Sequence, residues 1–203
     1  DGDGDGDGNG NGDAALDQMA ECATVGGLLA MARETQERMR GTLLRALADE
    51  HTGGGEELAD WAVKVAYPLQ ASWASSRYDP CVKSRQRTVQ KVEYKYSGLK
   101  QKGQSGYRRI HDAARLAVVC ADCDMMLLAV DRLKELFDVV ELQNRHREPT
   151  VLGWADITLL VRVPIDEDRW HIGEIQIQHS HFYFSRQTVH EHYVSLRESL
   201  PEK

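Results

Sequence analysis

The clearest restriction on the fold comes from two stretches near the C-terminal end in which apolar and polar residues alternate. The first carries apolar residues at Ile157, Leu159, Val161 and Val163, and the second reads Glu174-Ile-Gln-Ile-Gln178. Successive side chains of a β-strand point to opposite faces, so each stretch predicts a strand with one apolar face. We therefore expect Glu174, Gln176 and Gln178 to share one face of a sheet, with the isoleucines in the core.

Other segments predict two more strands and several helices. Strands are expected at 113–120 and 139–142. Helices are expected at 13–50, as one long or one broken helix, and at 56–73, 125–137 and 189–200. Pro68 predicts a kink or a stop near Tyr67 in the second of these helices. A glycine-rich basic loop is expected at 98–106. Helices followed by strands that are interleaved with helices predict an α+β protein with a mixed β-sheet flanked by helices.

The chain has 203 residues, which is enough for one domain with a substantial core. Residues 1–12 alternate Gly with Asp or Asn and predict a flexible linker. The remaining domain, 13–203, divides into a helical part, 13–80, and a sheet-containing part, 81–203. The chain opens on Asp-Gly repeats without Met, so we expect it to be part of a longer protein.

The sequence favours a location in the cytoplasm, and a location in an organelle is the alternative. Four cysteines are too few for a disulfide scaffold, so a reducing compartment is expected. No apolar run approaches the roughly 20 residues of a membrane-spanning helix, so a membrane partner is not expected.

A basic segment interrupts an otherwise acidic chain of net charge −7. Between Lys83 and Arg109 there are nine Lys or Arg residues and one acid, Glu93. Lys83, Arg87, Lys91 and Lys95 recur every four residues, opposite an apolar stripe of Val89, Val92, Tyr96 and Leu99. This pattern predicts a helix with one packed face and one row of cations. Because aromatic residues do not interleave with the cations, polyphosphates are a better match than nucleic acid.

Two acidic residues are candidates for the chemistry. Asp112 lies at the mouth of the strand predicted at 113–120, and Glu174 lies on the polar face of another strand. Carboxylate oxygens are the ligands that Mg²⁺ prefers, with water and substrate phosphates in its remaining positions. Two carboxylates and a row of cations are compatible with a phosphoryl-transfer site. Ordinary surface acids are the alternative at this point.

The chain resembles synthetases of the RelA/SpoT family through an ordered series of segments. That family has a basic helix with Lys-Ser and a later Lys, then Asp-x-x-Gly-x-Arg, Gly-Tyr-x-Ser-x-His, Glu-Ile-Gln-Ile-Arg-Thr and Glu-His. The corresponding segments here are Lys83-Ser84 with Lys91, Asp112-Ala-Ala-Arg115-Leu-Ala117, Gly153-Trp154-Ala-Asp156-Ile-Thr158, Glu174-Ile-Gln-Ile-Gln178-His179 and Glu191-His192-Tyr193. Of these, Glu-Ile-Gln-Ile followed by Glu-His is the most specific.

The resemblance implies a RelA/SpoT-like nucleotidyltransferase fold and synthesis of guanosine tetra- or pentaphosphate, in which pyrophosphate moves from ATP to the 3′-hydroxyl of GDP or GTP. It implies Asp112 and Glu174 as catalytic residues and Mg²⁺ ligands. Residues implied to bind the donor are Lys83, Arg85, Arg87, Lys91 and Arg115. Residues implied on the acceptor side are Trp154, Gln176 and His192. A homo-oligomer is compatible with this interpretation.

Three positions depart from the family pattern. Ala117 and Gln178 stand where the family has Arg, and Thr158 stands where it has His. Arg115 lies two residues before Ala117, so it is expected on the same side of the strand and as a partial substitute. Two alternatives remain. The first is a nucleotide-binding regulatory module without catalytic activity, and the second is an enzyme that transfers pyrophosphate to the hydroxyl of another acceptor. His171 and the other histidines of residues 171–192 are expected as polar contacts at the rim of the site.

Overall fold

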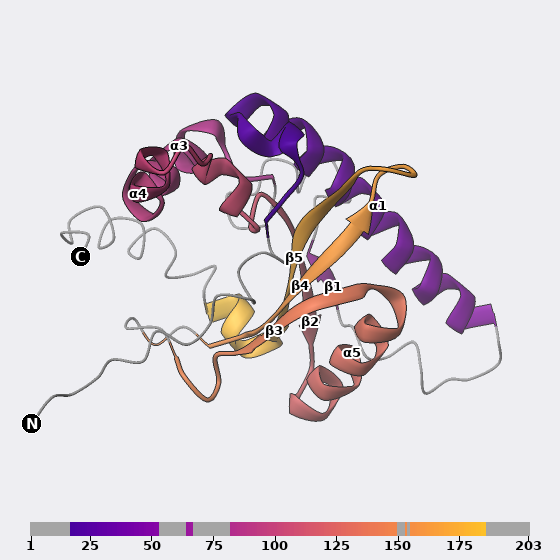
Figure 1. Cartoon of the computed structure of the whole chain (residues 1–203). Coiled ribbons are helices and arrows are strands. Elements are labelled where there is room, and N and C mark those ends of the chain that lie inside the picture. Colours follow the sequence, from indigo (N-terminus) through magenta and orange to yellow (C-terminus); the bar gives the residue numbers. More distant parts are fainter. Residues whose placement is uncertain (1–16, 53–63, 67–81, 150–152, 154, 186–203) are drawn as a thin grey trace, which may run out of the picture.

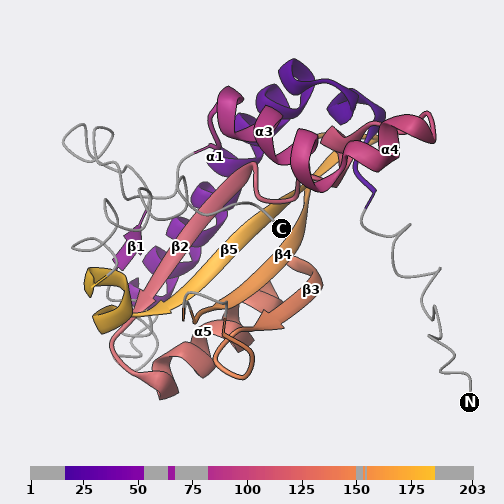
Figure 2. The ribbon, with the colours of Figure 1, turned by 90° about the vertical axis from the view of Figure 1, so that its left-hand side faces the viewer.

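A five-stranded mixed sheet forms the centre of the computed structural model, which describes residues 17–52, 64–66, 82–149, 153 and 155–185 (Figure 1). The strands are β1 (Lys64–Ala66), β2 (Ala114–Cys120), β3 (Asp138–Asn144), β4 (Ile157–Pro164) and β5 (Trp170–His179). Their order is β1-β2-β5-β4-β3 (Figure 2). β2 and β5 are parallel, and the other pairs are antiparallel. The predicted mixed sheet with flanking helices is confirmed.

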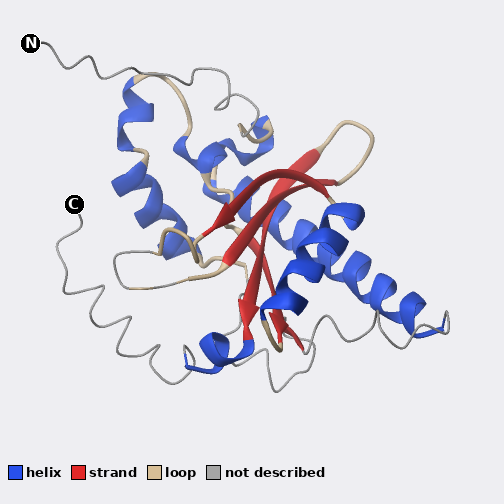
Figure 3. Cartoon of the chain, turned by 90° about the horizontal axis from the view of Figure 1, so that it is seen from below, coloured by secondary structure: helices blue, strands red, loops and turns tan. Residues whose placement is uncertain are grey.

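Helices cover one face of the sheet and one of its ends. They are η2 (Ala20–Ala23), α1 (Val25–Thr52), α3 (Arg85–Lys95), α4 (Ser97–Gln101), η4 (Gly106–Arg109) and α5 (Cys123–Leu136), and residues 180–185 form a further helical segment after β5. α1 and α5 pack against the sheet, while α3 and α4 lie together near the start of β2 (Figures 1 and 3). Local signals fix two helix starts, because Asp122 caps α5 through Met125 N and Ser84 caps α3 through Arg87 N.

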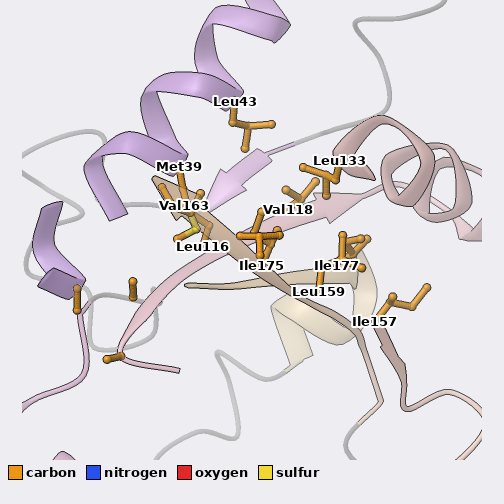
Figure 4. Close-up of a cluster of buried hydrophobic side chains, with 14 of the residues drawn as sticks. Met39, Leu43, Leu116, Val118, Leu133, Ile157, Leu159, Val163, Ile175 and Ile177 are labelled. Carbon is orange, nitrogen blue, oxygen red and sulfur yellow. The ribbon is translucent and has the colours of Figure 1, made fainter. Parts of the chain in front are cut away.

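The main core lies between the sheet and the two helices α1 and α5 (Figure 4). Its members include Met39 and Leu43 of α1, Leu133 of α5, and Leu116, Val118, Leu159, Ile175 and Ile177 of the sheet. Burying each such side chain stabilises the fold by about 1.5–3 kcal/mol. Gly173 lets α1 approach β5 closely, because a Cβ there would lie 2.6 Å from Met39 Sδ. The prediction that the isoleucines of β5 enter the core is confirmed.

One helix prediction is wrong in its middle. Residues 64–66 lie within the predicted helix 56–73, yet they form β1, which pairs with β2 through Val65 and Val118. The N–H and C=O groups along the outer side of β2 need partners, and this pairing supplies them. Pairing with the edge of β2 therefore decides the conformation of residues 64–66, although the spacing of apolar residues in the sequence is helical.

Two further expectations need correction. The segment 98–106 is not a continuous loop, because it contains α4 and the start of η4, and the buried Gly106 packs against Val92 and Tyr96. β4 is buried on both faces, with Thr158 and Leu160 only 1% and 6% exposed, whereas its alternation predicted a half-buried strand. The predicted linker 1–12 and final helix 189–200 lie outside the described residues.

A membrane-spanning helix was not expected from the sequence. Among the residues that the structure describes, no helix combines the length and apolar character needed to cross a membrane.

Candidate active site

The face of the sheet opposite α1 and α5 carries a patch of polar side chains, here called the polar face. It consists of Arg115 on β2, Glu174, Gln176 and Gln178 on β5, Thr158 on β4, and Glu141 and Gln143 on β3. Strand register aligns them in rows, since Arg115 pairs with Glu174 and Thr158 pairs with Gln176. The predicted common face of the three polar β5 residues is confirmed. A sheet with one apolar and one polar face can hold a reactive site without losing its core.

Asp112 lies at one end of the polar face, held between two lysines. It precedes β2 by two residues, and Ala114 pairs with Gly173, so Asp112 and Glu174 lie at the same end of the sheet. Lys83 Nζ donates to Asp112 Oδ2 at 2.5 Å, and Lys91 Nζ lies 3.0 Å from Oδ1. The cluster therefore contains one carboxylate and two ammonium groups, with a net charge of +1.

The backbone brings both lysines to Asp112. Lys83 N donates to the carbonyl of Ala113 at 3.0 Å, which fixes the segment just before α3 beside the start of β2. α3 then begins at Arg85 and buries Thr88, whose hydroxyl donates to the Ser84 carbonyl. Lys91 follows Thr88 by three residues and thus lies near the packed side of the helix.

The prediction that four cations form a row on one helix face is wrong. Lys83 precedes the helix, Lys91 turns toward Asp112, and Lys95 lies over the ring of Tyr96 at 5.6 Å. A buried carboxylate attracts the nearest ammonium groups more strongly than solvent does, which breaks the expected row. Arg85 is exposed and Arg87 is partly buried.

Charge and burial shift the pKa values of this cluster in different directions. Burial alone would raise the pKa of Asp112, but the positive charges of Lys91 and Lys83 outweigh it and hold the pKa well below its usual range. Burial lowers the pKa of Lys83 to about 8, although Asp112 acts in the opposite direction. Asp112 is therefore ionised at neutral pH. Its side chain is 20% exposed, so it is partly buried.

Glu174 belongs to a directional chain of hydrogen bonds along β5. Gln178 Nε2 donates to Gln176 Oε1 at 2.8 Å, and Gln176 Nε2 donates to Glu174 Oε1 at 2.6 Å. Burial raises the pKa of Glu174, and the negative charge of Asp112 raises it further. A carboxylate with a raised pKa at a fixed position is suited to accept a proton from a substrate hydroxyl.

The two carboxylates have the donor chemistry of a Mg²⁺ site. Asp112 Oδ1 is buried and Lys91 Nζ lies 3.0 Å from it, so a cation already faces this oxygen. Carboxylate oxygens of Asp and Glu suit a hard divalent ion, which could take the place of the ammonium group. The residues present fit Mg²⁺.

Arg115 lies on the same strand face as Ala117, as its spacing predicted. It pairs in register with Glu174. Burial raises the pKa of Glu174 and the charge of Arg115 offsets a part of that rise, whereas for Lys83 burial lowers the pKa and Arg115 adds slightly to the lowering. Ala117 is fully buried in a small cluster with Val119 and Tyr183. The side of β2 where the resemblance expects an arginine at 117 is therefore packed with an aromatic ring.

The structure brings six of the predicted site residues to one region, namely Lys83, Lys91, Asp112, Arg115, Glu174 and Gln176. Trp154 and His192, predicted on the acceptor side, lie outside the described residues. His171 is not a rim contact, because it is fully buried and neither ring nitrogen has a hydrogen-bond partner among the described residues. It occupies the core side of β5, two residues before Gly173, where a long apolar side chain would also fit.

Sequence reasoning missed a second polar cluster at the other end of the polar face. Arg145 Nη1 lies 3.0 Å from Asp156 Oδ1 and 3.2 Å from Thr158 Oγ1, and Arg145 Nη2 donates to Gln143 Oε1 at 2.9 Å. Arg145 follows the strand predicted at 139–142, and its eleven-residue separation from Asp156 has no helical or strand period. Only the pairing of β3 with β4 unites these residues.

Solved structures with the same arrangement identify the fold. A structure of small alarmone synthetase 1 from Bacillus subtilis bound to its product pppGpp aligns with a TM-score of 0.66 at 17% identity, covering 85% of this chain and 81% of that one. Small alarmone synthetase 2 from Bacillus subtilis aligns at 0.56 and 20% identity, covering 81% and 77%. A GTP pyrophosphokinase family protein from Streptococcus pneumoniae aligns at 0.59 and 15% identity, covering 84% and 77%.

The chain has the fold of the small alarmone synthetases. No protein-family model and no curated protein sequence matches it. At such low identity the backbone is shared while most side chains differ. The similarity therefore shows the fold, and the chemistry of the polar face has to be argued from the residues of this chain.

Proposed function

We propose that this chain synthesises guanosine tetra- or pentaphosphate by moving pyrophosphate from ATP to the 3′-hydroxyl of GDP or GTP. The observation that carries the proposal is the meeting of Asp112, Glu174, Lys83 and Lys91 at one end of the polar face, within a small alarmone synthetase fold. Two carboxylates and several cations at one point are the parts that phosphoryl transfer uses.

Asp112 and Glu174 are the residues that would hold Mg²⁺. The bound ion supplies positive charge that offsets the negative charge of the transferring phosphates. The low pKa of Asp112, which keeps this carboxylate ionised beside two ammonium groups, supports this assignment.

Lys83, Lys91 and Arg115 would bind the phosphates of ATP. Both lysines neutralise Asp112 in the free protein, at 2.5 and 3.0 Å. Once Mg²⁺ binds Asp112, the two ammonium groups can turn to the triphosphate. Asp112 then keeps a positive partner, so no buried charge is left unpaired. Arg85 and Arg87 on the first turn of α3 extend the basic region toward the donor.

Glu174 is the residue that we assign to proton removal. The acceptor 3′-oxygen attacks the β-phosphorus of ATP, the bond from that phosphorus to the oxygen bridging to the α-phosphorus breaks, and AMP leaves with that oxygen. The hydroxyl proton passes to Glu174. Gln176 holds Oε1 of Glu174 through its amide, so the carboxylate keeps its orientation during the transfer. On the acceptor side, Gln176, Trp154 and His192 remain the proposed contacts.

A nucleotide-binding regulatory module of the same fold is the second candidate. One observation favours it, since Ala117 is buried beneath Tyr183 where the resemblance expects a donor-binding arginine. Such a module would bind nucleotides without forming AMP. Calorimetry with a non-hydrolysable ATP analogue measures that binding directly.

The test is the conversion of ATP and GDP or GTP by purified protein in the presence of Mg²⁺. The proposal expects AMP together with a guanine nucleotide that migrates more slowly because it carries two additional phosphates. Nucleotide binding without AMP would favour the regulatory module. If the protein neither binds nucleotides nor forms AMP, both candidates are contradicted.

A further inference from the structure

Asp17, the first residue that the structure describes, lies on two arginines of η4. Its Oδ2 lies 2.8 Å from Arg108 Nη2, and its Oδ1 lies 3.6 Å from Arg109 Nε. The backbone is held at the same place, since Gln18 N donates to the Arg108 carbonyl at 3.2 Å and Arg108 Nε donates to the Gln18 carbonyl at 2.5 Å. Gln18 is fully buried, so this point of the chain is fixed on η4.

The sequence before Asp17 is strongly acidic. Residues 1–13, here called the acidic segment, contain five Asp and no Lys or Arg, so they supply −5 of the net charge of −7. The first basic residue of the chain is Arg33. The other positions of the segment are Gly or Asn, so charge dominates what the segment can recognise. A cationic surface is therefore its complement.

The cations of α3 lie beside the point where the acidic segment joins the described part of the chain. η4 packs closely against α3, because a Cβ on Gly106 would lie 2.8 Å from Val92 Cγ1 and 2.9 Å from Tyr96 Cβ. Lys91 and Lys95 each precede one of these two α3 residues, and α3 and α4 lie together in both Figure 1 and Figure 2. The cations of α3 and η4 therefore form one surface. This basic face consists of Arg85, Arg87, Lys91, Lys95, Arg108 and Arg109.

The acidic segment is long enough to reach the whole basic face. Asp7 precedes Asp17 by ten residues, and a Gly-rich chain of that length spans about 17 Å on average. α3 has 11 residues, so it is about 16 Å long. Aspartates that are joined to the chain at Asp17 would meet the cations of α3 at a local concentration on the order of 1 mM.

We propose that the acidic segment binds the basic face and competes there with the phosphates of the donor nucleotide. Asp carboxylates and phosphate oxygens are both anionic acceptors for the same Lys and Arg donors, so one group excludes the other. The contact of Asp17 with Arg108 and Arg109 is a pairing of the same kind at the adjoining position. The inference rests on the proposed function, because it takes the cations of α3 as part of the donor site. A segment that serves only as a linker is the competing role.

The test measures the affinity for inorganic tripolyphosphate by calorimetry. It compares the wild-type chain with a full-length serine variant that carries Asp3→Ser, Asp5→Ser, Asp7→Ser and Asp13→Ser. The affinity should rise by about 5-fold in the serine variant, because most of the competing carboxylates are gone. This gain should shrink when the salt concentration is raised from about 0.05 M to about 0.5 M, since salt screens exposed charges. An unchanged or lower affinity overturns the proposal.

A matched control changes the net charge by the same amount at other places. Its four exposed acids lie on α1, α5 and at the start of β3, and the changes are Glu37→Gln, Asp131→Asn, Glu135→Gln and Asp138→Asn. Pairs between exposed side chains contribute little to stability, so the control should fold. Its affinity for tripolyphosphate should stay within about 2-fold of wild type. An equal gain in both variants would show a general effect of net charge and overturn the proposal.

Cross-linking locates the acidic segment directly. A carbodiimide joins a carboxylate to an amine that it touches, and mass spectrometry identifies the joined peptides. Wild type should give links from the acidic segment to Lys91 or Lys95, and tripolyphosphate should suppress them. Links mainly to Lys134, which lies on α5 and is 48% exposed, would overturn the proposal.

Neither measurement requires the transfer of pyrophosphate, so failure of this inference and failure of the proposed function are distinguishable. If the serine variant binds tripolyphosphate more tightly while wild type forms no AMP, the proposed reaction is contradicted and the docked segment stands. If wild type forms AMP and the two proteins bind tripolyphosphate equally, this inference alone is contradicted. If neither protein binds tripolyphosphate, both are contradicted.

Discussion

The two faces of the sheet use the same strands for different purposes. On one face, Leu116, Leu159 and Ile175 pack against α1 and α5 and are closed to water. On the other face, Arg115 and Glu174 alternate along β2 and β5 with these apolar residues and take part in charge interactions. The apolar face tolerates changes that preserve volume, whereas the polar face depends on the identity of individual atoms. Stability and activity should therefore respond to different substitutions on one strand.

Removing the charge of Glu174 should separate the two faces most clearly. Glu174→Gln keeps the shape of the side chain but cannot accept a proton, so the rate of transfer should fall by at least about 100-fold. The unfolding temperature should change little. Steady-state AMP formation and thermal unfolding measure the two effects. Glu141→Gln, two strands away on the same face, is the control and should retain most activity; equal losses in both variants would argue against a specific role for Glu174.

The pH dependence of stability should reveal His171, a titratable residue buried on the apolar face. Burial, with a smaller contribution from His111, lowers the pKa of His171 from 6.5 to about 3. Between these values the unfolded chain binds one more proton than the fold. The free energy of unfolding should therefore fall as the pH drops from about 6.5 toward 3, by up to about 1.4 kcal/mol per pH unit.

His171→Leu provides the control for this pH effect. It should remove the contribution of His171 and leave stability at pH 7 unchanged or higher, because two buried nitrogens without partners disappear. Urea denaturation of both proteins from pH 7 to pH 5 gives the difference. Parallel curves would show that His171 is not a buried neutral group.

Nucleotide affinity should depend on the lysines beside Asp112 and not on basic residues in general. Lys91→Ala removes an ammonium group that we assign to the phosphates, so the affinity for an ATP analogue should fall by about 10-fold. Lys95 lies one turn further along α3, over the ring of Tyr96, so Lys95→Ala should have little effect on the affinity for the ATP analogue. Calorimetry at one fixed salt concentration makes the comparison. Equal decreases would indicate general attraction to a basic surface.

The smallest expected effect concerns the close contact between α1 and β5. A Cβ on Gly173 would lie 2.6 Å from Met39 Sδ and 3.3 Å from Thr35 Cγ2, so Gly173→Ala should cost about 1–2 kcal/mol of unfolding free energy. Gly98 in α4 has open space, and Gly98→Ala should be neutral or stabilising by about 0.5–1 kcal/mol. Chemical denaturation measures both. A harmless Gly173→Ala would mean that α1 is free to move away from the sheet.

The apolar face was predictable from the sequence because burial imposes a period. Ile175 and Ile177 alternate with Glu174 and Gln176, and that alternation fixes which face each side chain meets. β1 was not predictable in the same way. Its three residues are too few to show a period, and their strand conformation depends on the open edge of β2.

The candidate site was predictable in its residues and not in its pairings. Asp112, Glu174 and the lysines follow from residue type and order, yet the sequence suggested one row of cations along a helix face. The contact between Lys83 and Asp112 depends on a backbone hydrogen bond from Lys83 to Ala113. Arg145 and Asp156 meet only because β3 pairs with β4 after a register shift between Val139 and Glu141. Such long-range register is not encoded in local patterns.

The most direct test follows the β-phosphate of ATP. With ATP labelled at that position, GDP and Mg²⁺, the wild-type chain should move the label to the 3′ position of the guanine nucleotide and form one AMP for each product. Glu174→Gln should move almost none. Label recovered as free pyrophosphate, or transfer by Glu174→Gln at the wild-type rate, would contradict the assignment of the polar face as a pyrophosphate-transfer site.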